Sequence, residues 1–403
     1  MSPLPTQPLQ PPLWASIVIL MSAIGIVGSN SLLLSPLVLA VGSDLGVKPT
    51  EVMQAASAYG LGVAAAALTL APLGDRIGAG RLLRLALLAL ALGLAMSAAA
   101  PGLWGLIAAQ VLCGLAGGAA LPSIYTLAAV IAPRGREARV VGLVLTGWTL
   151  SMVLGVSLSA WLADLAGWRV VYLALALLAA LLWFSSAGLR RITSNAAGQV
   201  SSLLTAMRVP GIRRGLLASC LLMFSFYATY FFTGAHVTLS LGLSTAQAGL
   251  LPLFYGIGFG LAVIFDPLLD RLGLARASPP VFVLIALNYV VMLAFAENFT
   301  LLLVFALIWG IFQHLGLNLL VARLTGLDQA QRGAIMGLYS TITYLCVFAA
   351  PFAGALLFPL WGLMGCMALS ALLCLLEAIE SAITLRRHPS PDPDDCVSPD
   401  APV

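Results

Sequence analysis

Long apolar runs separated by short polar gaps make up most of this chain. Crossing a bilayer as a helix takes about 20 apolar residues, and Pro, Gly and charge clusters divide the sequence into twelve runs of this kind. The runs cover residues 14–41, 51–73, 81–99, 103–131, 140–165, 170–189, 214–241, 246–268, 281–295, 300–322, 334–358 and 361–385. The pattern predicts an all-α membrane protein with twelve transmembrane helices.

The longest internal stretch without such a run lies between the sixth and seventh runs, and it is polar and irregular. We interpret residues 191–213 as a cytoplasmic linker between two six-helix bundles, which cover residues 13–190 and 214–387. An N-terminal segment (1–12) precedes them. A tail rich in Pro and Asp (388–403) follows, and we expect this tail to be disordered.

A repeat supports the division into two bundles. Asp75-Arg76 follows the second run and Asp270-Arg271 follows the eighth, at an offset of 270 − 75 = 195 residues. A second similarity, around Gly142 and Gly337, has the same offset, 337 − 142 = 195. A good turn sequence would explain each loop singly but not the shared offset, so we expect a duplicated architecture with two pseudo-symmetric halves.

Positive charge falls almost entirely in every second gap between the runs. Of the 19 Lys and Arg residues, only Lys48 and Arg169 lie in the other gaps. Because Lys and Arg are concentrated in cytoplasmic loops, the alternation predicts an even number of spans in a bacterial-type inner membrane, with both termini in the cytoplasm.

Composition agrees with this topology. Hydrophobic residues make up 61% of the chain and charged residues 8%, whereas soluble domains carry roughly a quarter charged residues. A surface so poor in charge must face lipid. The arginines are explained as topology signals, so we expect a lipid bilayer and no nucleic acid as partner.

Three short motifs resemble the major facilitator superfamily, in its twelve-span drug and metabolite efflux branch of drug:proton antiporters and sugar exporters. Residues 73–78 (LGDRIG), followed by Arg81, resemble the family's motif between helices 2 and 3, although Ala71 replaces its first Gly and residues 79–80 (AG) replace a basic pair. Residues 35–37 (SPL) resemble the end of helix 1, and residues 167–169 (GWR) resemble the start of helix 6. The resemblance implies a monomeric secondary transporter that alternates access by rocking two bundles.

Two departures from the branch bear on proton coupling. Gln110 stands where helix 4 usually carries an Arg that is implicated in coupling, and Ser157 stands about where the antiporter motif of helix 5 has a Pro. We therefore expect proton-coupled efflux of a small molecule, with an importer or facilitator of the same fold as the alternative.

The duplicated Asp-Arg loops are the expected gate. The resemblance implies that Asp75 contacts the N-terminus of helix 11 and joins the halves in the outward-facing state, where the positive end of the helix dipole favours a carboxylate. The predicted gating residues are Asp75, Arg76, Arg81, Asp270 and Arg271. A solvated ion pair in each loop, contributing little to stability, is the alternative.

Polar residues in the middle of a span are costly in lipid and are candidates for substrate binding. Helices 1, 4, 7 and 10 line the site in the resembled family, and we add helix 11. The candidates are Asn30, Gln110, Tyr227, Tyr230, Trp309, Gln313, His314, Asn318 and Tyr344. Each of them could instead only bond to a neighbouring helix. Because these helices carry no acid or Arg at mid-depth, we expect a neutral or zwitterionic substrate.

His314 is the best-placed group that titrates near neutral pH, so it is the candidate proton carrier; a neutral His bonded across helices is the alternative. Asp266 maps near a helix end, and Glu377 is expected to snorkel toward the cytoplasmic surface beside Glu380.

Two other classes of protein remain open. Residues 364–367 (MGCM) and Cys220 with Met223 supply soft ligands for a metal transporter. A membrane enzyme would need a catalytic motif such as H-E-x-x-H or G-x-S-x-G, and the sequence contains neither. We expect no enzyme activity, no cofactor and no metal site.

Overall fold

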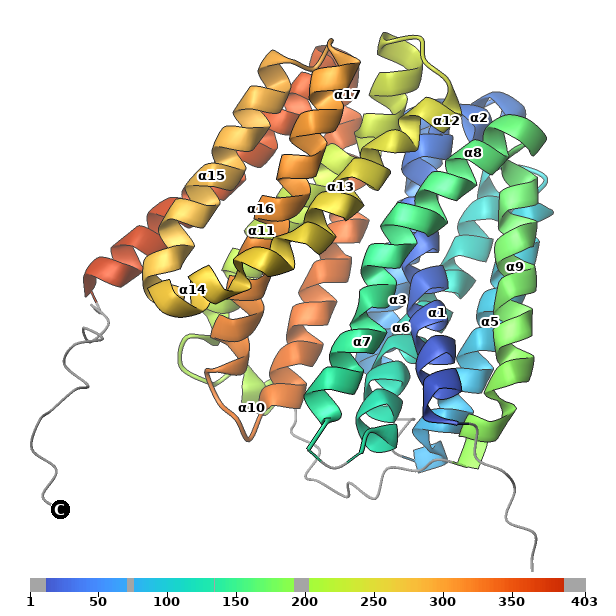
Figure 1. Ribbon diagram of the computed structural model, residues 1–403. Helices are drawn as coiled ribbons and strands as arrows, with labels where there is room; N and C mark the ends of the chain where they lie inside the picture. The colour runs from blue at the N-terminus through green and yellow to red at the C-terminus, as the bar shows by residue number, and fades with distance from the viewer. Residues whose placement is uncertain (1–11, 71–75, 134, 192–202, 388–403) are drawn as a thin grey trace, which may run out of the picture.

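The computed structural model describes residues 12–70, 76–133, 135–191 and 203–387 as a bundle of helices (Figure 1). The predicted gate residue Asp75, the tail 388–403 and residues 192–202 of the predicted linker lie outside the described residues. The described residues contain helices and turns without strands, which confirms the all-α expectation.

The first half of the chain forms the six expected spans, two of them in several pieces. Its helical elements are α1 (Leu13–Leu32), α2 (Leu34–Leu45), α3 (Pro49–Thr69), α5 (Ala79–Ala98), α6 (Leu103–Ile131), α7 (Glu137–Leu150), the π-helix η1 (Ser151–Val156), α8 (Ser157–Ala166), α9 (Trp168–Ser185) and the 3₁₀-helix η2 (Ser186–Arg191). The first span is thus α1 and α2 together, and the fifth span is α7, η1 and α8.

The second half repeats this plan. Its elements are α10 (Leu203–Ala206), α11 (Ile212–Ala235), the π-helix η3 (His236–Ser240), α12 (Thr245–Ala248), α13 (Leu250–Leu261), the 3₁₀-helix η4 (Ala262–Phe265), α14 (Asp266–Leu272), α15 (Leu274–Ala294), α16 (Phe299–Thr325) and α17 (Arg332–Arg387). The eighth span is therefore assembled from α12, α13, η4 and α14.

Twelve spans follow from the helix lengths. Within the described residues, eleven segments are long and apolar enough to cross a membrane, and the last of them, 332–384, has 53 residues. A straight helix of that length would measure about 80 Å, against about 30 Å of hydrocarbon. The chain instead reverses near Gly362, which has φ 58° and ψ −154°. The last segment is therefore two helices, as the sequence predicts.

One helix starts earlier than its sequence suggests. The ninth apolar run was expected from residue 281, but α15 begins at Leu274 and contains Pro279 and Pro280. Proline removes a backbone N–H and usually marks a break. Here both prolines lie in the first two turns, so the helix loses hydrogen bonds only near its end.

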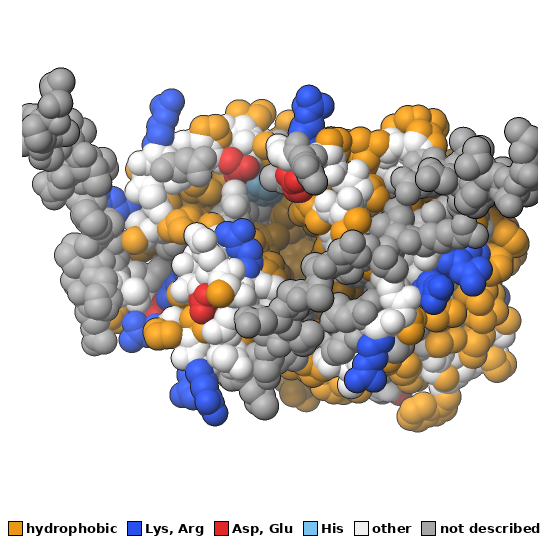
Figure 2. Space-filling view, turned by 90° about the horizontal axis from the view of Figure 1, so that it is seen from below, with side chains coloured by type: hydrophobic (Ala, Val, Ile, Leu, Met, Phe, Trp, Pro, Cys, Tyr) orange, Lys and Arg blue, Asp and Glu red, His pale blue; other side chains and the backbone are white. Residues whose placement is uncertain are grey.

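The two halves stand side by side and meet mainly at one end of the molecule (Figure 1). We call the end that carries the α6–α7, α9–α11, α14–α15 and α16–α17 loops the arginine end, because most of the Arg residues lie there. At the opposite end α2 contacts α11 and α8 contacts α12, and nearer the middle of the molecule η1 packs on α13 and α3 packs on α17. Viewed from the arginine end, the surface is hollowed in the middle and floored by hydrophobic side chains (Figure 2).

Small residues let the two halves approach closely. A Cβ built on Gly234 of α11 would collide with the backbone carbonyl oxygen of Ser35 in α2. About halfway along the molecule, a Cβ on Gly60 of α3 would lie 2.7 Å from the backbone nitrogen of Phe348 in α17. Only glycine fits at such contacts between helices, so the closed end is a tight seal.

Candidate functional site

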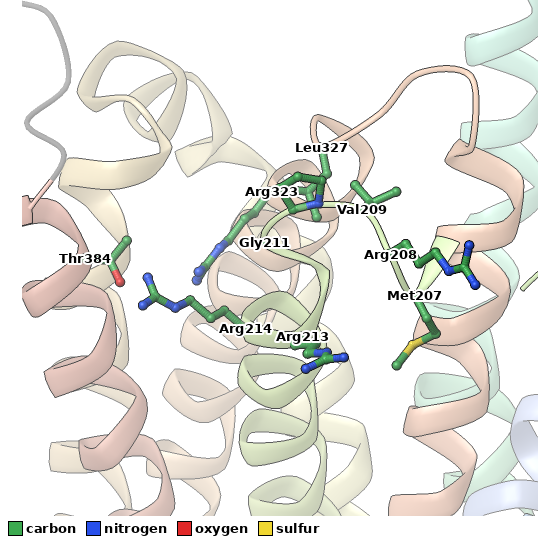
Figure 3. Close-up of a pocket in the computed structure, with 10 residues that line it drawn as sticks. Met207, Arg208, Val209, Gly211, Arg213, Arg214, Arg323, Leu327 and Thr384 are labelled. Atoms are coloured by element: carbon green, nitrogen blue, oxygen red, sulfur yellow. The ribbon is translucent and has the colours of Figure 1, made fainter. Parts of the chain in front are cut away.

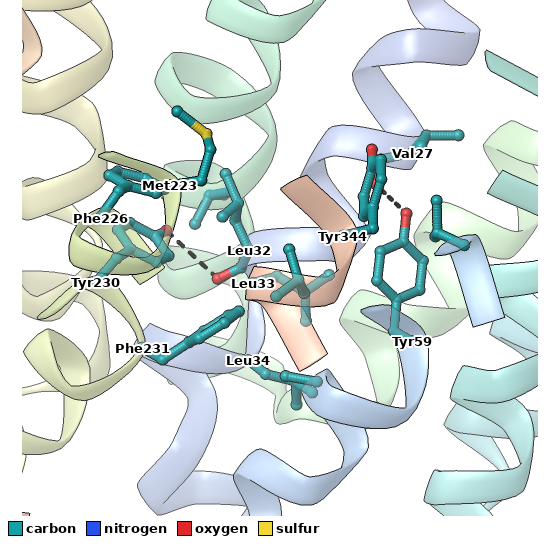
Figure 4. Packing of buried hydrophobic residues seen from close by; sticks show 14 of the residues in the cluster. Val27, Leu32, Leu33, Leu34, Tyr59, Met223, Phe226, Tyr230, Phe231 and Tyr344 are labelled. Atoms are coloured by element: carbon teal, nitrogen blue, oxygen red, sulfur yellow. Dashed lines mark hydrogen bonds between the residues drawn. The ribbon is translucent and has the colours of Figure 1, made fainter. Parts of the chain in front are cut away.

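The seal is centred on a pair of residues at equivalent places in the two halves. Ser35 Oγ donates a hydrogen bond of 2.6 Å to the backbone carbonyl of Tyr230, and these residues are 195 positions apart, which is the offset of the sequence repeat. The Tyr230 hydroxyl donates in return to the carbonyl of Leu32 at 3.3 Å (Figure 4). Tyr230, a predicted substrate contact, is therefore also part of the contact between the halves.

An aromatic cluster in the second half includes Tyr230 of the seal. The ring of Phe226 lies 5.3 Å from Tyr230, 5.2 Å from Tyr255 and 5.3 Å from Trp309. Trp309 also contacts Tyr289 at 5.5 Å. The cluster draws on α11, α13, α15 and α16, so the structure brings the predicted Tyr230 and Trp309 together and adds Tyr255 and Tyr289, which sequence reasoning missed.

Gln313 follows Trp309 by one helical turn and is 2% exposed. Neither its amide oxygen nor its amide nitrogen has a hydrogen-bond partner among the described residues, and the same holds for the indole nitrogen of Trp309. Buried polar atoms in proteins are nearly always paired. This unpaired amide beside aromatic rings therefore offers both a donor and an acceptor to a ligand or to water.

His314 forms a polar cluster with Asp266 and Asn318. Its Nε2 lies 3.2 Å from Asp266 Oδ1, and Asn318 Nδ2 donates to the same oxygen at 2.9 Å. The side chains of His314 and Asp266 are 16% and 29% exposed. Asp266 is the first residue of α14, just after the 3₁₀-helix η4 breaks the eighth span. The sequence placed Asp266 near a helix end. The break at η4 instead turns its carboxylate toward the tenth span.

Asn30 and Gln110 are brought together, but their hydrogen-bonding groups are used within the first half. Asn30 Nδ2 donates to Gln110 Oε1 at 3.0 Å, and Gln110 Nε2 donates to Ser97 Oγ at 3.1 Å. Both amides are buried. The residue that replaces the expected Arg of helix 4 thus bonds α6 to α1 and α5.

The two remaining tyrosines lie between the aromatic cluster and the other half. Tyr227 is half-buried and stacks on Phe231 at 5.5 Å. Tyr344 of α17 is 5% exposed and lies beside Tyr59 of α3, whose hydroxyl donates to the carbonyl of Val27 at 3.1 Å (Figure 4). The nine predicted substrate residues therefore fall into several contact groups, and their role in substrate binding stays a prediction.

The predicted gate is only partly described. Arg76, Arg81 and Arg271 are exposed at the arginine end, whereas Asp75 and the side chain of Asp270 lie outside the described residues. The gate stays a prediction.

Glu377 does not snorkel to the surface as expected. It is 1% exposed and faces Arg323 Nη1 of α16 at 3.9 Å. The expectation was wrong because Arg323 and Arg214 hold this end of α17 against the neighbouring helices, so the carboxylate points into the bundle.

The Gly-Trp-Arg segment ties three helix ends together at the sealed end. Arg169 forms an ion pair with Asp44 and donates to the carbonyl of Ala100 at 3.0 Å. Trp168 Nε1 donates to the same carboxylate at 3.2 Å, and the Arg169 guanidinium lies 4.4 Å from the Trp168 ring. This explains a positive charge at the end that otherwise lacks arginines.

Two cysteines, which could act as soft metal ligands, lie close together in the second half. Cys220 and Cys346 lie with their sulfur atoms 3.7 Å apart. Within the described part of the chain, His, Cys, Asp and Glu form no group of three or more that could hold a metal ion.

Comparison with known proteins agrees with this architecture. The model of the family described as Major Facilitator Superfamily matches residues 17–291. YwfA of Bacillus subtilis (strain 168), described as an uncharacterized MFS-type transporter, is 27% identical over 351 residues, which cover 79% of this chain and 80% of that protein. The family match begins within α1, covers the rest of the first half and reaches into α15. The chain belongs to the Major Facilitator Superfamily.

Proposed function

We propose that this transporter exports a small neutral or zwitterionic organic molecule in exchange for protons, as in the efflux branch of its family. Membership of the family indicates transport of a small substrate across a membrane. The direction, the coupling and the class of substrate are the proposed parts.

Alternating access is supported by one observation: the halves are in close contact at one end of the molecule and separated by a hollow at the other. The ends of α2 and α11 are sealed by Ser35 and Gly234, whereas the arginine end is hollowed between the halves (Figure 2). The arginine alternation assigns the open end to the cytoplasm. This arrangement suits a state that loads substrate from the inside, with the seal as the part that must open for release.

The chemistry of the interior supports a neutral or zwitterionic substrate. The unpaired Gln313 amide can accept and donate a hydrogen bond, and the half-buried Tyr227 ring offers a surface on which an amphipathic molecule or a sugar could stack. Pockets that combine apolar walls with a few polar groups are typical small-molecule sites. Asp266, the acid nearest to this region, already binds His314 and Asn318.

The His314–Asp266–Asn318 cluster supports proton coupling. A protonated His314 forms an ion pair with Asp266, and a neutral His314 leaves that carboxylate with the Asn318 amide as donor. The Asp266 carboxylate therefore keeps the Asn318 amide as a hydrogen-bond partner whatever bond it makes with His314. The cluster joins the eighth and tenth spans, so their movement can alter its affinity for a proton.

Transport in inside-out vesicles tests the proposal. A thermal-shift panel of neutral and zwitterionic amphiphiles and sugars, at two pH values, first supplies a probe that stabilises the purified protein. We expect uptake of that probe into the vesicles, stimulation by an acidic interior and collapse with a protonophore. His314→Gln should remove the stimulation, whereas His236→Gln should keep it, because His236 bonds to the Ala296 carbonyl away from Asp266.

The same experiment decides the alternative, which is an importer or facilitator. The replacement of the coupling Arg by Gln110, whose amide is used by Asn30 and Ser97, favours that reading. Probe movement that ignores the pH gradient in both wild type and His314→Gln would contradict proton coupling. Uptake only into right-side-out vesicles would contradict export.

A further inference from the structure

A cationic cavity lies at the arginine end of the second half, apart from the aromatic cluster, Gln313 and the His314 cluster, and it includes the Arg214 and Arg323 that hold the end of α17. It has a volume of about 730 Å³, and four of its lining residues are Arg208, Arg213, Arg214 and Arg323. Arg214 and Arg323 reach from α11 and α16 toward Thr384 on α17 (Figure 3). The cavity is thus framed by the ends of three helices, with the guanidinium groups of Arg214 and Arg323 on the side of Thr384 and those of Arg208 and Arg213 pointing away from it (Figure 3).

Local electrostatics favour an anion beside these arginines. Arg213 and Arg214 occupy the first turn of α11, which begins at Ile212. The N-terminus of a helix is its positive end and prefers negative charge. Two more arginines in the same cavity add repulsion between like charges. The arrangement therefore gains stability from any anion that enters.

The neighbouring acids offset only part of this charge. Glu380 lies 3.8 Å from Arg214 Nε and 3.7 Å from Arg323 Nη1. Glu377 lies 3.9 Å from the same Arg323 nitrogen. Both carboxylates contact only Arg214 and Arg323, whereas four arginines line the cavity, so at least two positive charges remain. These distances are also longer than the charge-assisted hydrogen bonds that arginine forms with a good partner.

The cluster is not a requirement of the duplicated fold. At the offset of 195 residues, the counterparts of Arg208, Arg213, Arg214 and Arg323 in the first half are Leu13, Val18, Ile19 and Ala128. The first half therefore builds the equivalent helix ends without charge. Arginines spread along the cytoplasmic loops would be enough to orient the chain in the membrane. Their convergence on one cavity therefore needs another explanation.

Exposed apolar side chains lie one turn deeper than the arginines. On α11, Leu217 follows Arg214 and is 53% exposed. On α17, Leu376 precedes Glu380 by one turn and is 47% exposed, and Ile379 is 49% exposed. A cationic cavity above an exposed apolar surface matches a molecule with an anionic head and a hydrocarbon tail, and it does not match a small soluble anion.

We propose that this cavity binds the phosphate-bearing headgroup of an anionic phospholipid. Arg214 and Arg323 would bind the phosphate oxygens, with Thr384 as a further donor, and the acyl chains would lie along Leu217 and Leu376. Guanidinium groups bind phosphate through paired charge-assisted hydrogen bonds. Basic pockets between transmembrane helices on the cytoplasmic side are suited to such headgroups.

Titration of the full-length protein by native mass spectrometry tests this site. The probes are phosphatidylglycerol, phosphatidylcholine of the same chain length and soluble glycerol 3-phosphate, each added to protein in neutral detergent. We expect phosphatidylglycerol to bind at least tenfold more tightly than phosphatidylcholine. Changing Arg214 and Arg323 together to Gln should weaken phosphatidylglycerol binding about 30-fold.

The matched control changes Arg136 and Arg139 to Gln, since both are exposed at the arginine end of the first half. This control should bind phosphatidylglycerol as the wild type does. Glu380→Gln provides a second variant with the opposite expectation, because it removes the carboxylate that competes for both arginines and should tighten binding. The proposal would be overturned if the two lipids bound equally well, or if the two double variants lost binding equally. It would also be overturned if Glu380→Gln bound phosphatidylglycerol more weakly, or if glycerol 3-phosphate competed fully with the lipid.

Discussion

Gln110 and Gln313 are both buried amides in this membrane protein, but their surroundings differ. Gln110 bonds to Asn30 and Ser97, so its polar atoms are satisfied inside the first half. Gln313 has no partner on either amide atom among the described residues. Leaving a buried polar group unpaired costs about 1–3 kcal/mol. The contrast suggests that Gln110 has a structural role and Gln313 a role in binding.

Replacing each glutamine by leucine separates these roles. Gln313→Leu removes two unpaired polar atoms, so we expect the thermal stability to be unchanged or raised while transport falls at least tenfold. Gln110→Leu leaves Asn30 and Ser97 without their partner and should lower the free energy of unfolding by about 1–3 kcal/mol. Thermal melts and vesicle transport of both variants check this. Normal transport by Gln313→Leu would exclude Gln313 from the substrate site.

The Asp44 carboxylate gives a second prediction, this time for stability alone. It holds Arg169 and Trp168 at the sealed end. Because Asp44 and Arg169 are 46% and 40% exposed, solvent weakens the ion pair, and Asp44→Asn should cost about 1 kcal/mol or less. Asp164→Asn, at another exposed carboxylate of the same end, serves as the control. A melting temperature of Asp44→Asn more than about 5 °C below that of Asp164→Asn would contradict this small contribution of the ion pair to stability.

The sequence predicted some of the interior residues and missed others for identifiable reasons. Tyr230 and Trp309 were found because aromatic and polar residues stand out within the cavity-lining helices. Tyr255 and Tyr289 lie on helices that the resemblance does not assign to the cavity. Asp266 looked like a helix-end residue, and only the 3₁₀ break before it turns its side chain toward His314.

Interruptions within helices are what hydrophobic periodicity could not predict. Runs of apolar residues set the spans and most of their ends, and α6 begins and ends as expected at Leu103 and Ile131. The π-helix η1 depends on a tertiary contact, since a Cβ on its Gly155 would overlap the Ser29 side chain of α1. Such π segments often mark functional sites. This one lies where the fifth span meets both α1 and α13.

The glycine at the seal gives a prediction about the balance of states. Gly234→Ala places a methyl group against the Ser35 carbonyl and destabilises the sealed end, at a cost of about 1–3 kcal/mol. We expect a cysteine introduced at the buried Thr233 to react at least tenfold faster with a maleimide in this variant. Native cysteines would be replaced first.

Gly142→Ala is the control for this change, because a Cβ there has nothing within 4 Å. Its labelling rate should equal that of the parent protein. If Gly234→Ala leaves Thr233 as protected as the control does, the seal is not closed by this contact.

At the scale of the whole molecule, the two halves share a duplicated scaffold but differ in the polar groups that they carry. Ser35 and Tyr230, 195 positions apart, join equivalent spans of the two halves. The cationic cavity, the His314 cluster and the unpaired Gln313 all belong to the second half. A two-fold scaffold therefore carries these groups in one half, and under the proposed mechanism the first half supplies the surface against which they move. The repeat was readable from sequence, whereas the closed end required the packing of helices far apart in the chain.

Distances between the halves at both ends test alternating access most directly. Double electron–electron resonance would use spin labels at the exposed positions 136 and 332 for the arginine end, and at 48 and 240 for the sealed end. The account predicts that the first distance shortens and the second lengthens, in the same populations, when pH or a stabilising ligand is changed. Two fixed distances under all conditions, or two distances that change in the same direction, would contradict it.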